Sequence, residues 1–320
     1  MKIQFVGGVG RVTGSCTLLE NSDGQFIVDC GMIQGEQQAN IDNARAFPFD
    51  PRTLKFVLLT HAHLDHCGLI PKLYKDGFVG KVYCTRATAF LAIEIMKDAA
   101  QIGAPYSKND VNLVNFEHLD GSRDFVWGKL QPVDQDLMVA LFRNAHVLGS
   151  VAISVVWGPE PHQNIWFTGD LGNNRKGYLP QPLLKGRHDL RNDVVNIVCE
   201  STYGSRTHKP WGDQDWRAKN LKTHIVQTLI RDSGTLVIPA FSLHRTQEVL
   251  FDLYYLLSRD DELKTGTYFD YLSEKFRFHS RDWFLKSTYD RIMAEVLSEG
   301  IVKENLLNEV DDCYSYYFIL

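Results

Sequence analysis

Three histidines and one aspartate are crowded into six residues of this sequence, directly after an apolar segment. The segment is Phe56–Thr60, and the polar residues are His61, His63, Asp65 and His66. Imidazole nitrogens and carboxylate oxygens are ligands of Zn²⁺ and related ions. A polar loop with scattered histidines is the alternative, but imidazoles crowded after a buried strand would repel one another on protonation. The spacing therefore predicts a metal site at the end of a strand.

Other potential ligands lie at the ends of further segments that have the pattern of strands. Asp29, His146 and Asp170 end or follow the segments 25–29, 137–144 and 164–168, and Glu200 follows 194–199. An isolated histidine such as His146 would more often be a hydrogen-bonded, partly buried side chain. A strand holds the loop at its end rigidly, and α/β proteins place their chemistry there. The recurrence therefore favours one shared site.

The predicted ligands suit two ions. One ion takes His61, His63 and His146, the other takes Asp65 and His66, and Asp170 bridges them. Two ions about 3.5–4 Å apart can lower the pKa of a water and clamp the attacking and leaving oxygens of an in-line displacement. This arrangement predicts attack by hydroxide on a phosphodiester. Asp29 is expected to orient ligands without binding the ion.

The elements that position these residues follow the pattern of apolar and polar residues. Strands are expected over 2–6, 16–20, 25–29, 56–60, 80–84, 137–144, 151–157, 164–168, 194–199 and 234–240. Helices are expected over 69–76, 85–101, 223–232 and 245–257, and the polar stretch 106–115 is expected to cross the surface. Such alternation is typical of an α/β fold. The glycines of Gly7–Gly14 do not fit a dinucleotide-binding loop, so no such cofactor is predicted.

Length and composition set outer limits on the function. A chain of 320 residues suggests about two domains, and 44% hydrophobic and 23% charged residues are ordinary for a globular protein. The six cysteines form no C-x-x-C pair, which predicts reduced, mostly buried thiols. The start does not fit a signal peptide and no apolar run approaches the roughly 18 residues of a membrane span. We therefore expect a cytoplasmic protein without a membrane partner.

The formal net charge of −5 argues against binding of nucleic acid by the whole surface, so a polyanion would need a local basic groove. Residues 205–223 carry several basic residues with Trp211 and Trp216 interleaved. This stretch is either a solvated helix start or an edge that faces phosphates and stacks bases. Arg206 and Arg245 are the candidate phosphate contacts, the latter in a turn that could hold an anion.

Together these motifs resemble the metallo-β-lactamase superfamily, and within it the β-CASP branch of nucleases that includes the cleavage and polyadenylation endonuclease. The resemblance rests on the His61–His66 motif, the opening segment 5–16, the acidic motif at Glu200–Gly204 and the segment 238–248. It implies an αββα sandwich over 1–203 and a partial β-CASP domain over 204–320. It also implies Zn²⁺, with two ions expected, and a catalytic part for Asp65, Asp170 and Glu200.

The resemblance implies a zinc-dependent phosphodiesterase of ribonuclease type, which hydrolyses RNA or single-stranded nucleic acid with a metal-bound hydroxide. It covers about residues 1–260, and no later histidine matches the family's C-terminal histidine motifs, which implies a chain shortened at its C-terminus. His244 stands where relatives commonly carry glycine. Two alternatives stay open: a catalytically impaired RNA-binding or scaffold relative, and a small-molecule metallo-hydrolase of the same fold. Endonuclease or exonuclease mode, and a homodimer, are also left open.

Overall fold

The computed structural model describes residues 1–158, 163–172, 195–207 and 214–231, together with single residues between 236 and 256. The chain divides into two compact units: the first is Met1–Asn174 with Leu179–Ser205, and the second is Arg175–Tyr178 with Arg206–Leu320. The predicted domain boundary after residue 203 and the β-CASP nature of the second domain stay predictions. The predicted strand over 234–240 and helix over 245–257 lie largely outside the described residues.

The first unit begins with a six-stranded sheet whose strands follow one another in chain order. Its strands are β1 (Lys2–Gly7), β2 (Cys16–Asn21), β3 (Gly24–Val28), β4 (Leu54–Leu58), β5 (Lys81–Cys84) and β6 (Phe116–His118). The first two pairings are antiparallel and the next three are parallel. In the parallel pair of β3 and β4, Val28 lies opposite Leu58, so both strands deliver their carboxyl ends to the same edge.

The second sheet has the order β11-β10-β9-β8-β7. Its strands are β7 (Gln131–Asp134), β8 (Leu137–Arg143), β9 (Val151–Trp157), β10 (Gln163–Phe167) and β11 (Val195–Val198). Strands β8 and β10 are both antiparallel to β9, which lies between them, so they run in the same direction. Their carboxyl ends therefore also meet at one edge.

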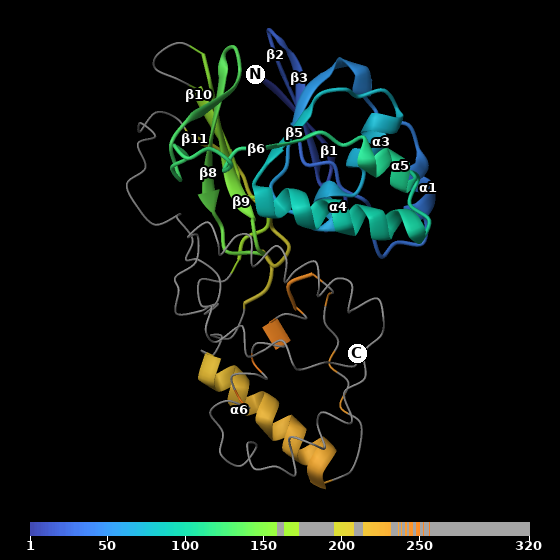
Figure 1. Ribbon diagram of the computed structural model, residues 1–320, viewed down its shortest axis with the longest axis vertical. Helices are drawn as coiled ribbons and strands as arrows, with labels where there is room; N and C mark the ends of the chain where they lie inside the picture. Colours follow the sequence, from blue (N-terminus) through green and yellow to red (C-terminus); the bar gives the residue numbers. More distant parts are fainter. Residues whose placement is uncertain are drawn as a thin grey trace. The chain divides into compact units, whose positions relative to one another are not determined.

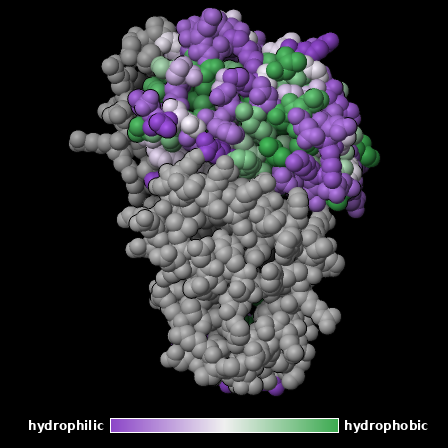
Figure 2. All heavy atoms as spheres, viewed as in Figure 1, coloured by the Kyte–Doolittle hydropathy of each residue, from purple (hydrophilic) through white to green (hydrophobic). Residues whose placement is uncertain are grey.

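The core lies between the two sheets. Leu19, Phe26 and Leu58 of the first sheet pack with Leu141 and Ile153 of the second, all buried. Figure 1 shows the two sheets side by side, with helices α1, α3, α4 and α5 on the far side of the first sheet. This is the layered α/β sandwich that was expected, and the fold prediction is confirmed. Hydrophilic residues cover much of the described surface on the face in Figure 2.

The α-helices described in the first unit are short, with α4 as the exception. They are α1 (Ala39–Ala44), α2 (Leu64–Cys67), α3 (Ile70–Lys75), α4 (Arg86–Gln101) and α5 (Lys108–Asn112), and the second unit adds α6 (Gln214–Ile225) and a π-helix that covers Val226–Arg231. The 3-10 helix Pro51–Thr53 precedes β4. In the described residues no helix combines the length and the apolar character needed to cross a membrane.

Most predicted elements of the first unit are confirmed to within two residues, because their apolar residues recur with the spacing of a strand or a helix. The stretch 106–115 differs: Tyr106 is buried, and α5 forms behind a capping box in which Ser107 and Asp110 bond to each other's backbone. A capping box stabilises a short helix without an apolar face, which is why hydrophobic periodicity missed it. The helix expected from Thr223 already begins at Gln214.

Candidate metal centre

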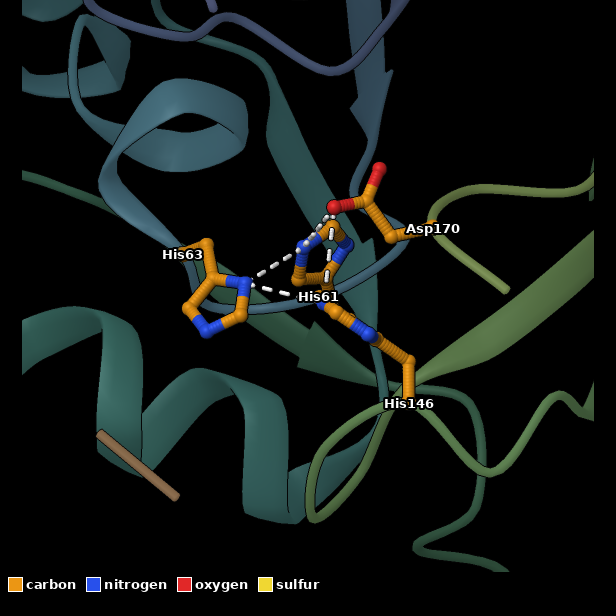
Figure 3. A group of neighbouring side chains, drawn as sticks. All are labelled: His61, His63, His146 and Asp170. Carbon is orange, nitrogen blue, oxygen red and sulfur yellow. Dashed lines mark hydrogen bonds and ion pairs between the residues drawn. The ribbon is translucent and has the colours of Figure 1, made fainter. Parts of the chain in front are cut away.

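Four side chains from three strand ends converge at one edge of the sandwich. His61 and His63 follow β4, His146 follows β8 and Asp170 follows β10. One donor atom from each lies within 4.8 Å of the donor atoms of the other three. Figure 3 shows the four side chains directed at a common centre. The structure thus brings together residues that the sequence places more than a hundred positions apart.

The spacing of the donor atoms fits a tetrahedral ion. The Nδ1 atom of His63 lies 3.1 Å from Nε2 of His61 and 3.0 Å from Nε2 of His146. The Oδ2 atom of Asp170 lies 3.4 Å from Nε2 of His146 and 3.8 Å from Nε2 of His61. A tetrahedral Zn²⁺ with ligands at about 2.1 Å has edges of about 3.4 Å between ligand atoms. Three imidazoles and one carboxylate of this spacing can therefore hold one zinc ion.

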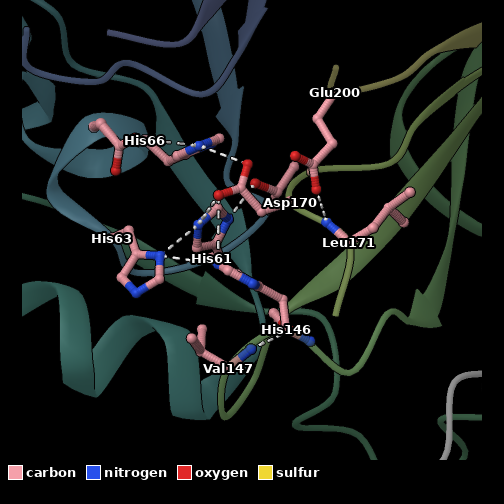
Figure 4. A network of polar contacts seen from close by, with 12 residues as sticks. His61, His63, His66, His146, Val147, Asp170, Leu171 and Glu200 are labelled. Carbon is pink, nitrogen blue, oxygen red and sulfur yellow. Dashed lines mark hydrogen bonds and ion pairs between the residues drawn. The ribbon is translucent and has the colours of Figure 1, made fainter. Parts of the chain in front are cut away.

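The second oxygen of Asp170 faces a different group. Its Oδ1 atom lies 3.2 Å from Nε2 of His66, and Oδ2 of Asp65 lies 3.9 Å from that same nitrogen. Figure 4 shows His66 on the side of Asp170 away from His146. Asp170 thus stands between the four-residue group and a second group made of Asp65 and His66. This is the arrangement expected of a carboxylate shared by two ions.

Asp29 contacts the second group, Asp65 and His66, through the ring of His66. Its Oδ2 atom lies 2.8 Å from Nδ1 of His66, and the carboxylate accepts hydrogen bonds from the backbone N–H and the hydroxyl of Thr60. The hydroxyl of Thr60 lies 3.0 Å from Nδ1 of His61. Such outer contacts fix the ring orientation of histidine ligands. Thr60 was not singled out from the sequence, although it is the last residue before the first histidine.

The backbone of Asp29 is held in the left-handed region, with φ of 60°. Its N–H donates to the carbonyl of Leu58 at 2.9 Å, so the residue turns sharply off the end of β3 while still bonded to β4. Left-handed backbone is uncommon outside glycine, and aspartate is one of the residues that tolerates it. The turn aims the carboxylate at Thr60 and His66.

The two sides of the centre differ in their protonation. Burial, together with the neighbouring His66, His146 and His63, lowers the pKa of His61 well below its usual value, so its ring is a neutral donor. Burial alone would lower the pKa of His66 as well, but the carboxylates of Asp29 and Asp170 raise it well above its usual value. Burial raises the pKa of Asp65. Without an ion, His66 is therefore a cation between carboxylates.

This protonation leads to a first prediction. In metal-free protein, Asp29→Asn is expected to lower the free energy of unfolding by about 3 kcal/mol at pH 6, because it leaves a buried cation with one carboxylate fewer. The folded pKa of His66 lies above the unfolded value of about 6.5, so this stabilisation is complete below that pH and is lost as the pH rises through the folded pKa. Urea unfolding at several pH values measures it.

Asp134→Asn is a suitable control for this experiment. Asp134 pairs with Lys55 at the partly exposed end of β7, and such pairs contribute about 1 kcal/mol or less. A loss of stability at Asp29→Asn that matches the control at every pH would contradict the role given to the Asp29–His66 pair.

Glu200 follows β11 and reaches the Asp170 loop. Its Oε1 atom accepts a hydrogen bond from the backbone N–H of Leu171, and its own N–H lies 3.4 Å from the hydroxyl of Thr168. Glu200 therefore contacts the chain on both sides of Asp170, through the Thr168 side chain and the Leu171 backbone, and Figure 4 shows the contact with Leu171. Its predicted catalytic part stays a prediction, and the geometry describes a positioning contact.

The remaining candidates lie elsewhere. Arg206 is exposed and Arg245 pairs with Glu248, and both belong to the second unit, so their contact with phosphate stays a prediction. His244 has φ of 74°, in the left-handed region that glycine adopts most readily. Cys67 is fully buried and its thiol donates to the carbonyl of Ala62 at 3.4 Å, while burial raises its pKa. Cys67 thus packs beneath the histidines.

Comparison with known proteins gives a consistent set of matches. A family model described as the metallo-beta-lactamase superfamily matches residues 9–219. Ribonuclease TTHA0252 of Thermus thermophilus is 36% identical over 256 residues, which are 79% of this chain and 55% of that protein. Transcription termination factor FttA of Lokiarchaeum sp. is 30% identical over 287 residues, which are 88% of this chain and 43% of that protein.

An RNase J-like protein of Methanocaldococcus jannaschii is 28% identical over 254 residues, which are 78% of this chain and 53% of that protein. The chain thus spans about half the length of these relatives. The family expected from the motifs is confirmed, and the relatives agree with the resemblance to RNA-processing nucleases.

Proposed function

Because this chain belongs to the metallo-β-lactamase superfamily, we propose that it is a metal-dependent nuclease that hydrolyses phosphodiester bonds of RNA. The observation that carries the proposal is the convergence of His61, His63, His146 and Asp170, with a second group of Asp65 and His66 on the other oxygen of Asp170. The names of two relatives, a ribonuclease and an RNase J-like protein, support RNA as the substrate class.

Each residue has a defined part in the proposed centre. The three imidazoles of His61, His63 and His146 would hold one zinc ion and Asp65 and His66 would hold a second, while Asp170 stands between the two groups. When bound, the ions supply an activated water for attack and neutralise charge on the phosphate. Asp29 and Thr60 keep His66 and His61 in the required orientation. Glu200 keeps the Asp170 loop in place.

The test is cleavage of a labelled single-stranded RNA by purified protein supplied with zinc. Cleavage of the RNA, with a chromogenic lactam and a thioester left intact, is expected. Hydrolysis of the lactam or the thioester without RNA cleavage would instead indicate a small-molecule hydrolase of the same fold. Tight RNA binding without any hydrolysis would indicate the RNA-binding relative. The cytoplasmic location and the homodimer stay predictions.

Metal analysis gives a second prediction. The unaltered chain is expected to retain about two zinc ions after gel filtration, and Asp65→Asn about one, because the change removes a carboxylate ligand from the second group only. Elemental analysis of the purified proteins measures the ratio. Asp136→Asn is the control, since Asp136 is exposed in the turn before β8, at the opposite end of that strand from His146. Equal ratios in all three proteins would contradict the assignment of Asp65.

A further inference from the structure

Asn144 joins two loops that each carry a member of the four-residue group. It lies one residue beyond β8 and two before His146, and only 1% of it is exposed. Its side-chain Nδ2 atom donates to the carbonyl of Thr168 at 2.9 Å, and its backbone carbonyl accepts from the N–H of Gly172 at 3.0 Å. Thr168 and Gly172 stand two residues before and two residues after Asp170, so Asn144 holds both sides of that loop.

The oxygen of the Asn144 side-chain amide is hydrogen-bonded to the His146 loop. This Oδ1 atom accepts a hydrogen bond from the hydroxyl of Ser150 at 2.5 Å. The Ser150 oxygen in turn accepts from the N–H groups of His146 at 3.2 Å and Val147 at 3.0 Å. Ser150 is buried as well, so these bonds are shielded from water. One buried side chain thus ties the backbone of both loops.

The loops also touch directly, backbone against backbone. A Cβ atom on Gly172 would lie 1.6 Å from the carbonyl oxygen of Ala145, so the chain tolerates only glycine there. Ala145 itself has φ of 56°. This contact brings the loops close together, but it contains no side chain that sets their register. The amide of Asn144 supplies that register through hydrogen bonds in both directions.

We infer that Asn144 is a positioning residue that sets the separation between Nε2 of His146 and Oδ2 of Asp170, and thereby the affinity of the centre for its ion. That separation is 3.4 Å in the structure. The inference rests on the metal site of the proposed function. Loss of an outer contact of this kind typically lowers metal affinity about 10- to 100-fold.

The test replaces Asn144 with leucine, which has a similar shape and no hydrogen-bonding group. Asn144→Leu is expected to weaken zinc binding by at least about tenfold, measured by competition with a chelating indicator. Cobalt provides a second measurement, since its visible absorption is intense in a tetrahedral site and weak in an octahedral one. Asn144→Leu is expected to weaken that absorption even at saturating cobalt, because the donor atoms no longer share the tetrahedral spacing.

Asn43→Leu is the matched control. Asn43 is equally buried, and its amide also bonds to backbone in both directions, accepting from the N–H of Ile33 at 2.8 Å and donating to the carbonyl of Ile33 at 2.9 Å. It lies in α1, and both of these hydrogen bonds go to Ile33, outside the His146 loop and the Asp170 loop. Its loss is expected to reduce stability by a similar amount and leave zinc affinity unchanged.

Zinc affinity of Asn144→Leu equal to that of the unaltered chain would overturn the inference, and so would an equal loss in Asn43→Leu. Should Asn144→Leu fail to fold, Ser150→Ala decides, with a loss of about threefold or more expected and unchanged affinity overturning the inference. Zinc binding without RNA cleavage by the unaltered chain would refute the proposed function alone. Absence of zinc binding in the unaltered chain would refute both.

Discussion

His63→Ala is expected to reduce RNA cleavage at least about a thousand-fold in protein supplied with zinc. The Nδ1 atom of His63 is close to both other imidazoles of the centre, at 3.1 Å from His61 and 3.0 Å from His146. Alanine has no donor atom, so the substitution removes one of the three imidazole ligands. A rate change of this size corresponds to about 4 kcal/mol in the barrier, which is reasonable for the loss of a metal ligand.

The measurement is the initial rate of cleavage of a labelled RNA at fixed zinc concentration. His118→Ala is the control, because His118 lies in β6, outside the donor group, with its ring near Phe90. The control is expected to cleave at the rate of the unaltered chain. Cleavage that persists unchanged in His63→Ala would rule out the proposed centre as the catalyst and point to a contaminating nuclease.

Removal of the metal is expected to lower the melting temperature of the first unit by roughly 10 °C. Free zinc at about a thousand times its dissociation constant stabilises a folded protein by about 4 kcal/mol. For a unit of this size each kcal/mol shifts the midpoint by about 2–4 °C. The stabilisation by zinc has its physical source in three imidazoles crowded around one point. Burial and the neighbouring rings already disfavour the charged form of His61 there.

Differential scanning calorimetry before and after treatment with a chelator measures the shift, and added zinc is expected to reverse it. In His63→Ala the same treatment is expected to move the midpoint by less than about 3 °C. An equally large shift in that variant would show that zinc stabilises the protein through another site.

The parts of the centre that could be predicted are those with a local signal. Each ligand follows a continuous apolar run, and a strand that ends in a histidine or a carboxylate is visible in the sequence alone. The registers of the two sheets then explain why these ends meet, since β3 and β4 are parallel and β8 and β10 share a direction.

The supporting residues carry no such signal. Thr60 bonds to Asp29 across 31 residues, and Asn144 bonds to Thr168 across 24. Threonine and asparagine beside a strand end are ordinary turn residues, and only the folded chain shows which backbone they meet. The short elements β6, β7 and α5 were missed for a related reason, because they are too brief to show hydrophobic periodicity.

The close backbone contacts at two glycines have a consequence for anyone who wishes to move this centre into another protein. A Cβ atom at Gly31 would lie 1.6 Å from the carbonyl oxygen of Asp65, just as one at Gly172 would lie against Ala145. The close approach of the loops beneath the histidines and aspartates, with no side chain between them, is one condition of this geometry. If the six ligand residues alone were grafted, side chains in place of the two glycines would keep the loops too far apart for the donor atoms to meet at one centre. The portable unit therefore includes these two glycines, in addition to the ligands and the residues that orient them, Asp29, Thr60 and Asn144.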